Sequence, residues 1–187
     1  LVENGKIKEL CSSINKSAEK IIHEPHLIMI PGMIDPHVHF REPGAEYKET
    51  LYTGSKSAVA GGVTSFFEMP NTKPSTTTQS TIAQKKEIAK NTSLANYNFF
   101  IGATSDNIEE CLNVENVAGI KIYVGSSTGS LLVCEESYLR EFFKRSNKLI
   151  AVHSECEEIV QRNAEQYSNS KDVHDHIKIR SVDAAIT

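Results

Sequence analysis

Apolar and polar positions alternate with two different periods along most of this chain. Short runs rich in β-branched and aromatic residues predict strands, and the longer stretches between them, with apolar positions three or four residues apart, predict helices. The predicted strands cover residues 33–40, 63–69, 97–101, 119–124 and 149–153. The predicted helices cover residues 49–60, 77–90, 107–112, 135–144 and 155–166. Each of these strands except the last is followed by a helix before the next strand begins.

This alternation is typical of parallel βαβ units, so we expect an α/β fold. The sequence contains no G-x-G-x-x-G or G-K-[ST] phosphate loop that would favour nucleotide binding. A (β/α)8 barrel needs about 250 residues, so a chain of 187 residues would hold only part of one. Alternation alone leaves an open doubly wound sheet and a partial barrel as alternatives.

The first thirty residues differ from the rest of the chain. Two apolar pairs, Leu1-Val2 and Ile21-Ile22, flank a polar stretch that contains the turn dipeptide Asn4-Gly5. We therefore expect both pairs to form strands of a small β-subdomain in residues 1–30. Residues 31–187 would then form the first part of the barrel, truncated after about five strands, with a further helix begun at its end.

Charge and composition exclude several classes of protein. The chain has 20 Lys and Arg against 24 Asp and Glu, a formal charge of −4, and so lacks the basic field that nucleic acid or anionic lipid would attract. Its longest apolar stretch, 27–34, is interrupted by Pro31-Gly32 and is too short for a membrane span. No secretory signal pattern opens the sequence. The four cysteines are scattered without a C-x-x-C pair, which favours reduced thiols in the cytoplasm.

The strongest chemical feature is the segment Asp35-Pro36-His37-Val38-His39. Side chains two apart on a strand share a face about 7 Å apart, so His37 and His39 can converge on one metal ion. The end of an early strand is also where α/β barrels build their active sites. The alternative is a pair of surface histidines on an edge strand.

Lys121 and His153 stand on two further predicted strands. Alternation directs Ile120 and Ile122 to covering helices and Lys121 inward, where a cation must be paired, deprotonated or modified. A deprotonated Lys121 can capture carbon dioxide as a carbamate, whose oxygens bind divalent ions; a structural ion pair is the alternative. His153 alone would be a structural residue, but together with His37, His39 and Lys121 it completes a ligand set that suits zinc.

Two residues near these ligands are suited to an anionic substrate. Arg41 follows His39 by two positions and can hold a carboxylate through two hydrogen bonds. Asn71, in the turn after the second strand, can add another hydrogen bond. The alternatives are a salt bridge from Arg41 to Glu42 or Glu68, and an ordinary turn at Asn71. A second H-x-H, His174 and His176, lies in a polar stretch and is set aside.

At this level of detail the sequence resembles the dihydroorotases of the amidohydrolase superfamily. The resemblance is carried by four segments in the family's order: PGMIDPHVHFREPG at 31–44, EMPNTKP at 68–74, GIKIY at 119–123 and VHSE at 152–155. Hydantoinases and allantoinases share the histidines and the lysine but usually lack an arginine at the position of Arg41. The combination of FREPG with MPNT is therefore more specific to dihydroorotase than the H-x-H.

The resemblance implies a barrel with a small β-sandwich and a site for two Zn²⁺ ions. His37 and His39 would bind the more buried ion, carbamylated Lys121 would bridge, and His153 would bind the second ion; some dihydroorotases use an aspartate as the bridge. Arg41 and Asn71 would hold the substrate carboxylate. The implied reaction is the reversible cyclisation of N-carbamoyl-L-aspartate to (S)-dihydroorotate in pyrimidine biosynthesis.

The same resemblance places the general-base aspartate and one further metal-binding histidine on later strands, beyond Thr187. No catalytic residue is therefore expected within these 187 residues, and we predict that they are inactive alone. Two other functions stay open: a hydantoinase or allantoinase type of cyclic amidase, and an inactive dihydroorotase-like scaffold. The oligomeric state is also open, and a homo-oligomer is compatible with the sequence.

Overall fold

The computed structural model describes residues 1–125 and 131–186, which divide into two compact units, Leu1–Pro31 and Gly32–Thr187. The strands, in chain order, are β1 (Val2–Glu3), β2 (Lys6–Ile7), β3 (Met33–Val38), β4 (Val63–Glu68), β5 (Asn96–Gly102), β6 (Gly119–Tyr123) and β7 (Ile150–His153). The helices are α1 (Leu51–Ala60), α2 (Gln79–Thr92), α3 (Ile108–Asn113), α4 (Glu136–Arg145), α5 (Glu157–Gln166), α6 (Asp175–Ile179) and α7 (Val182–Ile186).

The smaller unit is built on one short hairpin. Strands β1 and β2 pair antiparallel, with Val2 opposite Ile7. The turn between them places Asn4 at φ 52° and Gly5 at φ 72°, as a tight hairpin turn requires. The prediction of a strand at Ile21-Ile22 was wrong, because these side chains are 81% and 73% exposed and no second layer in this unit covers them. The assignment of residues 1–30 to a β-sandwich stays a prediction.

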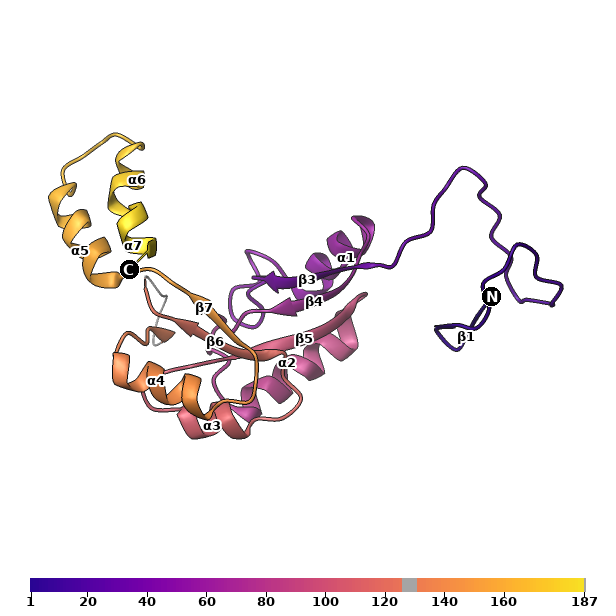
Figure 1. The fold of residues 1–187 in the computed structure, drawn as a ribbon, viewed down its shortest axis with the longest axis horizontal. Coiled ribbons are helices and arrows are strands. Elements are labelled where there is room, and N and C mark those ends of the chain that lie inside the picture. Colours follow the sequence, from indigo (N-terminus) through magenta and orange to yellow (C-terminus); the bar gives the residue numbers. More distant parts are fainter. Residues whose placement is uncertain (126–130, 187) are drawn as a thin grey trace. The chain divides into compact units, whose positions relative to one another are not determined.

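The larger unit is organised around a five-stranded parallel sheet in the order β3-β4-β5-β6-β7. Strands that are consecutive in the sequence are neighbours in the sheet, as in a barrel, and a doubly wound sheet would reverse its order at a switch point. The sheet curls into a half-barrel (Figure 1). The predicted partial barrel is therefore confirmed, and each predicted strand of this unit lies within a few residues of an observed one.

The hydrophobic core lies between one face of this sheet and the helices that follow the strands. Ile120 and Ile122 of β6 are fully buried in it, and helices α1 to α4 contribute one or more residues each. The helix contributions are Leu51, Ile82, Ala89, Cys111 and Phe142. Figure 1 shows α2, α3 and α4 along the same side of the sheet. The opposite face of the sheet is therefore left to the side chains of the candidate site.

Helix starts show how local chemistry sets the boundaries. Thr50 and Thr78 cap α1 and α2, each in a reciprocal pair with the threonine three residues later. Helix α5 begins at Glu157, two residues later than predicted. The preceding residues are held elsewhere, because the Cys156 amide donates to the Ala184 carbonyl at 2.7 Å and Glu155 contacts His153.

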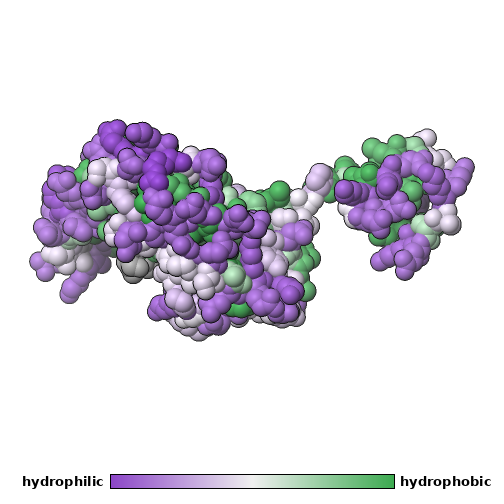
Figure 2. Space-filling model, turned by 90° about the horizontal axis from the view of Figure 1, so that it is seen from below, coloured by the Kyte–Doolittle hydropathy of each residue, from purple (hydrophilic) through white to green (hydrophobic). Residues whose placement is uncertain are grey.

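Polar side chains dominate the view of the surface in Figure 2, with smaller apolar areas between them. The residues with the most exposed apolar side chains in the smaller unit include Leu10 and Ile28, at 87% and 89%. Within residues 1–125 and 131–186, no helix has the length and apolar character to cross a bilayer.

Candidate active site

His37 and His39 meet at the carboxyl end of β3. Their Nε2 atoms lie 3.2 Å apart and their ring centroids 5.1 Å apart. Two imidazole nitrogens that bind one tetrahedral zinc ion at about 2.0–2.1 Å are separated by roughly 3.3 Å. The spacing of the two nitrogens therefore suits a shared ion, which is what the H-x-H pattern on a strand predicts.

Asn71 fixes the ring of His39. The Oδ1 atom of Asn71 lies 2.7 Å from Nδ1 of His39 and, being an acceptor, assigns the ring proton to Nδ1. The lone pair of Nε2 is then directed toward His37. Outer partners of this kind orient metal-binding histidines in general. The sequence analysis assigned Asn71 to a substrate carboxylate; in this arrangement only its Nδ2 group is left for that task.

Partial burial acts against the charged form of both rings. They are exposed on their open side, yet partial burial lowers the pKa of His37 below 6.5, and the charges of Lys121 and His153 act in the same direction. Burial also lowers the pKa of His39, against the opposing effect of its hydrogen bond to Asn71. A neutral imidazole is the form that binds a metal ion.

Lys121 lies where the alternation of β6 predicted. Its side chain is 1% exposed, with Nζ 4.9 Å from the centre of the Tyr123 ring. Burial lowers the pKa of Lys121, and no carboxylate pairs with it among residues 1–125 and 131–186. The structural ion pair that was the alternative for Lys121 is therefore not formed within the described part of the chain.

Tyr123 is a site residue that the sequence analysis did not single out. It is 6% exposed, and its hydroxyl has no hydrogen-bond partner in the described part of the chain. Burial raises its pKa to about 12, so the hydroxyl keeps its proton. The signal in the sequence was its position two residues after Lys121, which puts both side chains on the same face of β6.

His153, at the end of β7, faces a carboxylate of its own loop. Its Nε2 lies 2.9 Å from Oε2 of Glu155, which also pairs with Arg180, and its ring centroid is 6.0 Å from that of Tyr123. Partial burial acts to raise the pKa of Glu155, but Arg180 and His153 together bring it below its usual value. The charge of His153 helps to lower the pKa of His37, and the Nε2 atom of His153 is directed to Glu155.

Arg41 makes neither of the salt bridges considered from the sequence. Glu68 is paired instead with Lys85, at 2.6 Å, and Glu42 accepts a hydrogen bond from the Leu51 amide at the start of α1. The guanidinium Nη1 donates to the backbone carbonyl of Asn71 at 3.4 Å. In the described part of the chain it has no carboxylate partner.

A pocket of about 370 Å³ adjoins Arg41 and Asn71. Two further cations line it, and none of its lining residues is acidic; the others are Ala45, Tyr47, Lys48, Thr72, Lys73 and Ser75. Such a pocket favours an anionic group. It therefore places a cationic binding surface beside the His39–Asn71 contact.

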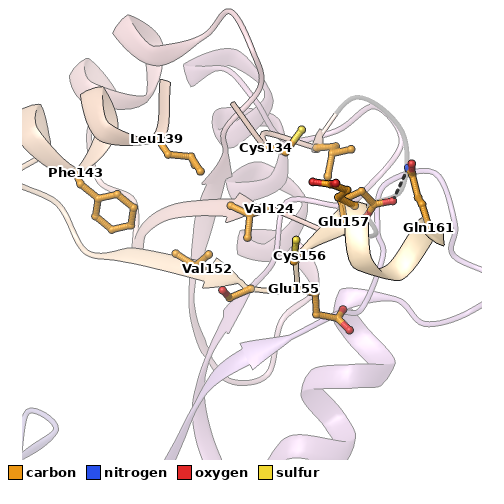
Figure 3. Close-up of a pocket in the computed structure, with 12 residues that line it drawn as sticks. Val124, Cys134, Leu139, Phe143, Val152, Glu155, Cys156, Glu157 and Gln161 are labelled. Atoms are coloured by element: carbon orange, nitrogen blue, oxygen red, sulfur yellow. Dashed lines mark hydrogen bonds between the residues drawn. The ribbon is translucent and has the colours of Figure 1, made fainter. Parts of the chain in front are cut away.

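A larger cleft, of about 760 Å³, lies away from these residues (Figure 3). Its apolar lining includes Val124 and Val152, which alternate with Tyr123 and His153 along their strands and so belong to the helix-covered face of the sheet. Gln161 closes one side through its hydrogen bond to Glu157 at 3.0 Å. The cleft thus opens on the other face of the sheet from the candidate site, although Glu155, the partner of His153, contributes to its lining.

The second H-x-H pair of the sequence lies apart from the candidate site. His174 and His176 are at the start of α6, His174 as its N-cap residue, and neither belongs to the site. Within residues 1–125 and 131–186, no three His, Cys, Asp or Glu side chains gather as a ready metal site. A complete ligand set here needs the amine of Lys121, or its carbamate, besides the histidines.

This chain belongs to the amidohydrolase family, which matches residues 28–179. Among curated relatives, it is 34% identical over 164 residues to a dihydroorotase of Methanosarcina acetivorans, covering 85% of this chain and 35% of that protein. It is 33% identical to a dihydroorotase of Pyrococcus furiosus, over 88% of this chain and 38% of the relative. It is also 39% identical over 132 residues to the multifunctional protein CAD of Squalus acanthias, covering 69% of this chain and 6% of CAD.

A solved structure extends the comparison. The L-hydantoinase (dihydropyrimidinase) from Arthrobacter aurescens superposes with a TM-score of 0.77 at 26% identity, covering 83% of this chain and 36% of the hydantoinase. A D-hydantoinase from Thermus sp. has a TM-score of 0.66 at 21% identity and shows the likeness of fold alone. The chain thus spans little more than a third of the length of the dihydroorotases and hydantoinases it matches.

Proposed function

We propose that these residues form the first part of a zinc-dependent cyclic amidase that interconverts N-carbamoyl-L-aspartate and (S)-dihydroorotate in pyrimidine synthesis. The observation that carries the proposal is the Arg41 guanidinium, which has no carboxylate partner in the described part of the chain and rests on the same residue, Asn71, that orients His39. Dihydroorotate carries both a ring amide and a carboxylate. One cluster of residues would thus address both ends of this substrate.

Two of the residues, His37 and His39, have the spacing that a shared metal ion requires, whereas Nε2 of His153 is directed to Glu155. His37 and His39 would hold one ion through their Nε2 atoms, His153 would hold the second, and Lys121 would bridge them as its carbamate. When bound, the zinc ions supply Lewis acidity and lower the pKa of water to near neutrality. This assignment is supported by the 3.2 Å spacing of the two Nε2 atoms and by the buried amine of Lys121, which has no carboxylate partner among residues 1–125 and 131–186.

The environment of Lys121 supports the proposed carbamate. Burial lowers the pKa of Lys121 and so increases the fraction of neutral amine. The neutral nitrogen attacks the carbon of CO₂: an N–C bond forms, one C=O π bond breaks with its electron pair moving to oxygen, and one proton leaves the nitrogen for solvent. The neutral amine is thus replaced by an anion with two oxygen ligands, whose charge the bound metal ions would balance.

The chain's other residues position the substrate. Arg41 would donate two hydrogen bonds to the substrate carboxylate, and the Nδ2 group of Asn71 would donate a third. Nδ1 of His39 keeps its proton and donates it in a hydrogen bond to Oδ1 of Asn71, which leaves Nε2 free as a ligand. We infer that the general base, an aspartate, comes from a later strand, and that these residues alone are inactive. A cytoplasmic location is part of the proposal, supported by four cysteines that are all free.

The test uses the complete enzyme, meaning the polypeptide that carries these strands with the rest of its barrel. Zinc-loaded enzyme is assayed with dihydroorotate and with dihydrouracil, which has the same ring without the carboxylate. In Arg41→Ala, kcat/KM for dihydroorotate should fall at least about 100-fold, roughly the 2.7 kcal/mol of a lost charged pair. The rate with dihydrouracil should stay within about twofold. Arg140→Ala, at an exposed site on α4, is the matched control.

The outcomes separate the alternatives. Dihydrouracil or hydantoin turnover equal to that of dihydroorotate, with no effect of Arg41→Ala, would favour the hydantoinase type that the L-hydantoinase likeness supports. Full zinc loading with no turnover of any cyclic amide would favour the inactive scaffold. Either result would overturn the proposed substrate.

A further inference from the structure

Arg41 has a main-chain conformation that its residue type disfavours. Its φ is 83°, in the left-handed region, where a side chain beyond Cβ is strained. A residue keeps such a conformation only when its surroundings hold it there. The contacts of the Arg41 backbone are therefore as informative as those of its guanidinium.

Besides the Ala45 amide, which donates to the Arg41 carbonyl at 3.2 Å, the Arg41 backbone is held by Glu68, the last residue of β4. Its Oε1 atom accepts a hydrogen bond from the Arg41 amide at 2.9 Å, across the β3–β4 junction. The side chain is 0% exposed. A buried carboxylate at this place is unusual, because an apolar residue would pack as well and would not require a counter-charge.

Lys85 of α2 locks Glu68 in place from the other side. Its Nζ lies 2.6 Å from Oε2 of Glu68 in a close ion contact, although the direction of approach is not that of a hydrogen bond. Nζ also donates to the Met69 carbonyl at 3.3 Å and lies 4.7 Å from the centre of the Phe99 ring. With Lys85 1% exposed, the two buried side chains have little room to rearrange.

A continuous set of contacts therefore leads from the core to the candidate site. It runs from Lys85 to Glu68, from Glu68 to the Arg41 amide, from the Arg41 guanidinium to the Asn71 carbonyl, and from the Asn71 side chain to His39. The first two members touch neither the histidines nor the pocket beside Arg41. Their effect on a substrate would pass through the position of Arg41.

We propose that Glu68, locked by Lys85, is a positioning residue that holds Arg41 in its left-handed conformation and so aims the guanidinium at a substrate carboxylate. This inference rests on the proposed function, because it assumes that Arg41 binds an anion. It goes further in assigning a substrate-selecting role to a buried ion pair remote from the substrate. Without the Glu68 acceptor, the peptide plane that enters Arg41 would be free to turn, so the left-handed conformation would lose one of its two backbone anchors and the guanidinium would leave the Asn71 carbonyl.

The test compares two double variants of the complete enzyme. Glu68→Leu with Lys85→Met replaces the pair by apolar side chains of similar size, which cores usually tolerate. Glu68→Gln with Lys85→Met also removes both charges but keeps an oxygen that can accept from the Arg41 amide. We expect the Leu/Met variant to raise KM for dihydroorotate at least about tenfold, equivalent to 1.4 kcal/mol, and to leave kcat/KM for dihydrouracil within about twofold. The Gln/Met variant should restore KM to within about threefold of the parent.

The readout separates positioning from a general structural role. Equal losses on both substrates, or no rescue by the Gln/Met variant, would overturn the inference, because a loosened barrel affects every substrate. A crystal structure of the Leu/Met variant gives a measurement independent of activity: Arg41 should have lost its positive φ, and an unchanged φ would refute the role of Glu68. If the parent enzyme fails to turn over dihydroorotate, the proposed function fails, and the φ of Arg41 still decides the inference.

Discussion

The buried ion pair of Glu68 and Lys85 leads to a quantitative prediction for the free energy of unfolding. Lys85→Met removes the positive charge and keeps most of the side-chain volume on α2. Glu68, which is 0% exposed in the parent, would lose its counter-charge and, within the described part of the chain, would keep the Arg41 amide as its hydrogen-bond donor. Breaking a buried ion pair on one side costs about 3–5 kcal/mol, because the remaining charge is uncompensated.

This cost is large against the total stability of a domain, about 5–15 kcal/mol. For a chain of 187 residues, each kcal/mol lowers the Tm by about 2–4 °C, so Lys85→Met should lower it by roughly 6–20 °C. Replacing both partners, as in Glu68→Leu with Lys85→Met, should bring the free energy of unfolding back to within about 2 kcal/mol of the parent. The predicted pattern is thus a severe single variant and a mild double variant.

The pH dependence of the Lys85→Met deficit has a definite sign. Burial already raises the pKa of Glu68 above 4.5, and the charge of Lys85 opposes this rise, so its loss raises that pKa further. The folded variant then binds a proton more readily than the unfolded chain, and its stability increases as the pH falls through the folded-state pKa. The deficit should therefore be larger at pH 8 than at pH 5.

Thermal and urea unfolding followed by circular dichroism, at pH 5 and pH 8, measures both effects. Glu136→Gln, which breaks an exposed pair with Arg140 on α4, is the matched control and should change stability by less than about 1 kcal/mol. A Lys85→Met variant as stable as the parent at pH 8 would refute the reasoning. So would a double variant that is less stable than the single one.

Two further predictions concern the packing and chemistry of the core. Gly119→Ala should destabilise the sheet by about 1–3 kcal/mol, because the added Cβ would lie 2.5 Å from the Leu149 carbonyl oxygen. In the control variant Gly61→Ala the nearest atom to the added Cβ is at 3.5 Å, so the urea midpoint should change little. Equal midpoints for the two variants would contradict the packing of β6 on β7. Cys111 should resist iodoacetamide at pH 8, because burial raises its pKa to about 12, while the exposed Cys11 and Cys134 react. Mass spectrometry of the alkylated peptides, with a urea-unfolded sample as control, would expose an error if Cys111 were labelled as fast as Cys134.

The positions of the strands and the face of each strand were accessible from local sequence, whereas the strand order that separates a barrel from a doubly wound sheet was not. The five strands and their intervening helices follow from periodicity and from glycine and proline punctuation, and parallel neighbours follow from the alternation itself. The burial of Lys121 between Ile120 and Ile122 was predicted from the two-residue period of a strand, which is a covalent property of the backbone. The meeting of His37 and His39 has the same origin.

Local pattern failed where a contact depends on distant residues. Ile21-Ile22 has the composition of a strand but no strand to pair with, and pairing is a property of two segments. The salt bridge from Arg41 to Glu68 that the sequence left open is not formed, because Lys85, seventeen positions after Glu68, pairs with that carboxylate. No spacing rule connects a helix residue to a particular strand residue across a core.

The sequence by itself determined the alternating elements, the inward residues of each strand and the chemical types gathered at the strand ends, because these depend on backbone geometry over a few residues. Only the tertiary structure decided that Asn71 contacts His39, that Glu155 contacts His153, and that Glu68 holds the Arg41 amide. The first and third contacts join the ends of the paired strands β3 and β4, and the second depends on how the chain turns after β7. Their energies depend on distance and burial, which exist only in the folded chain.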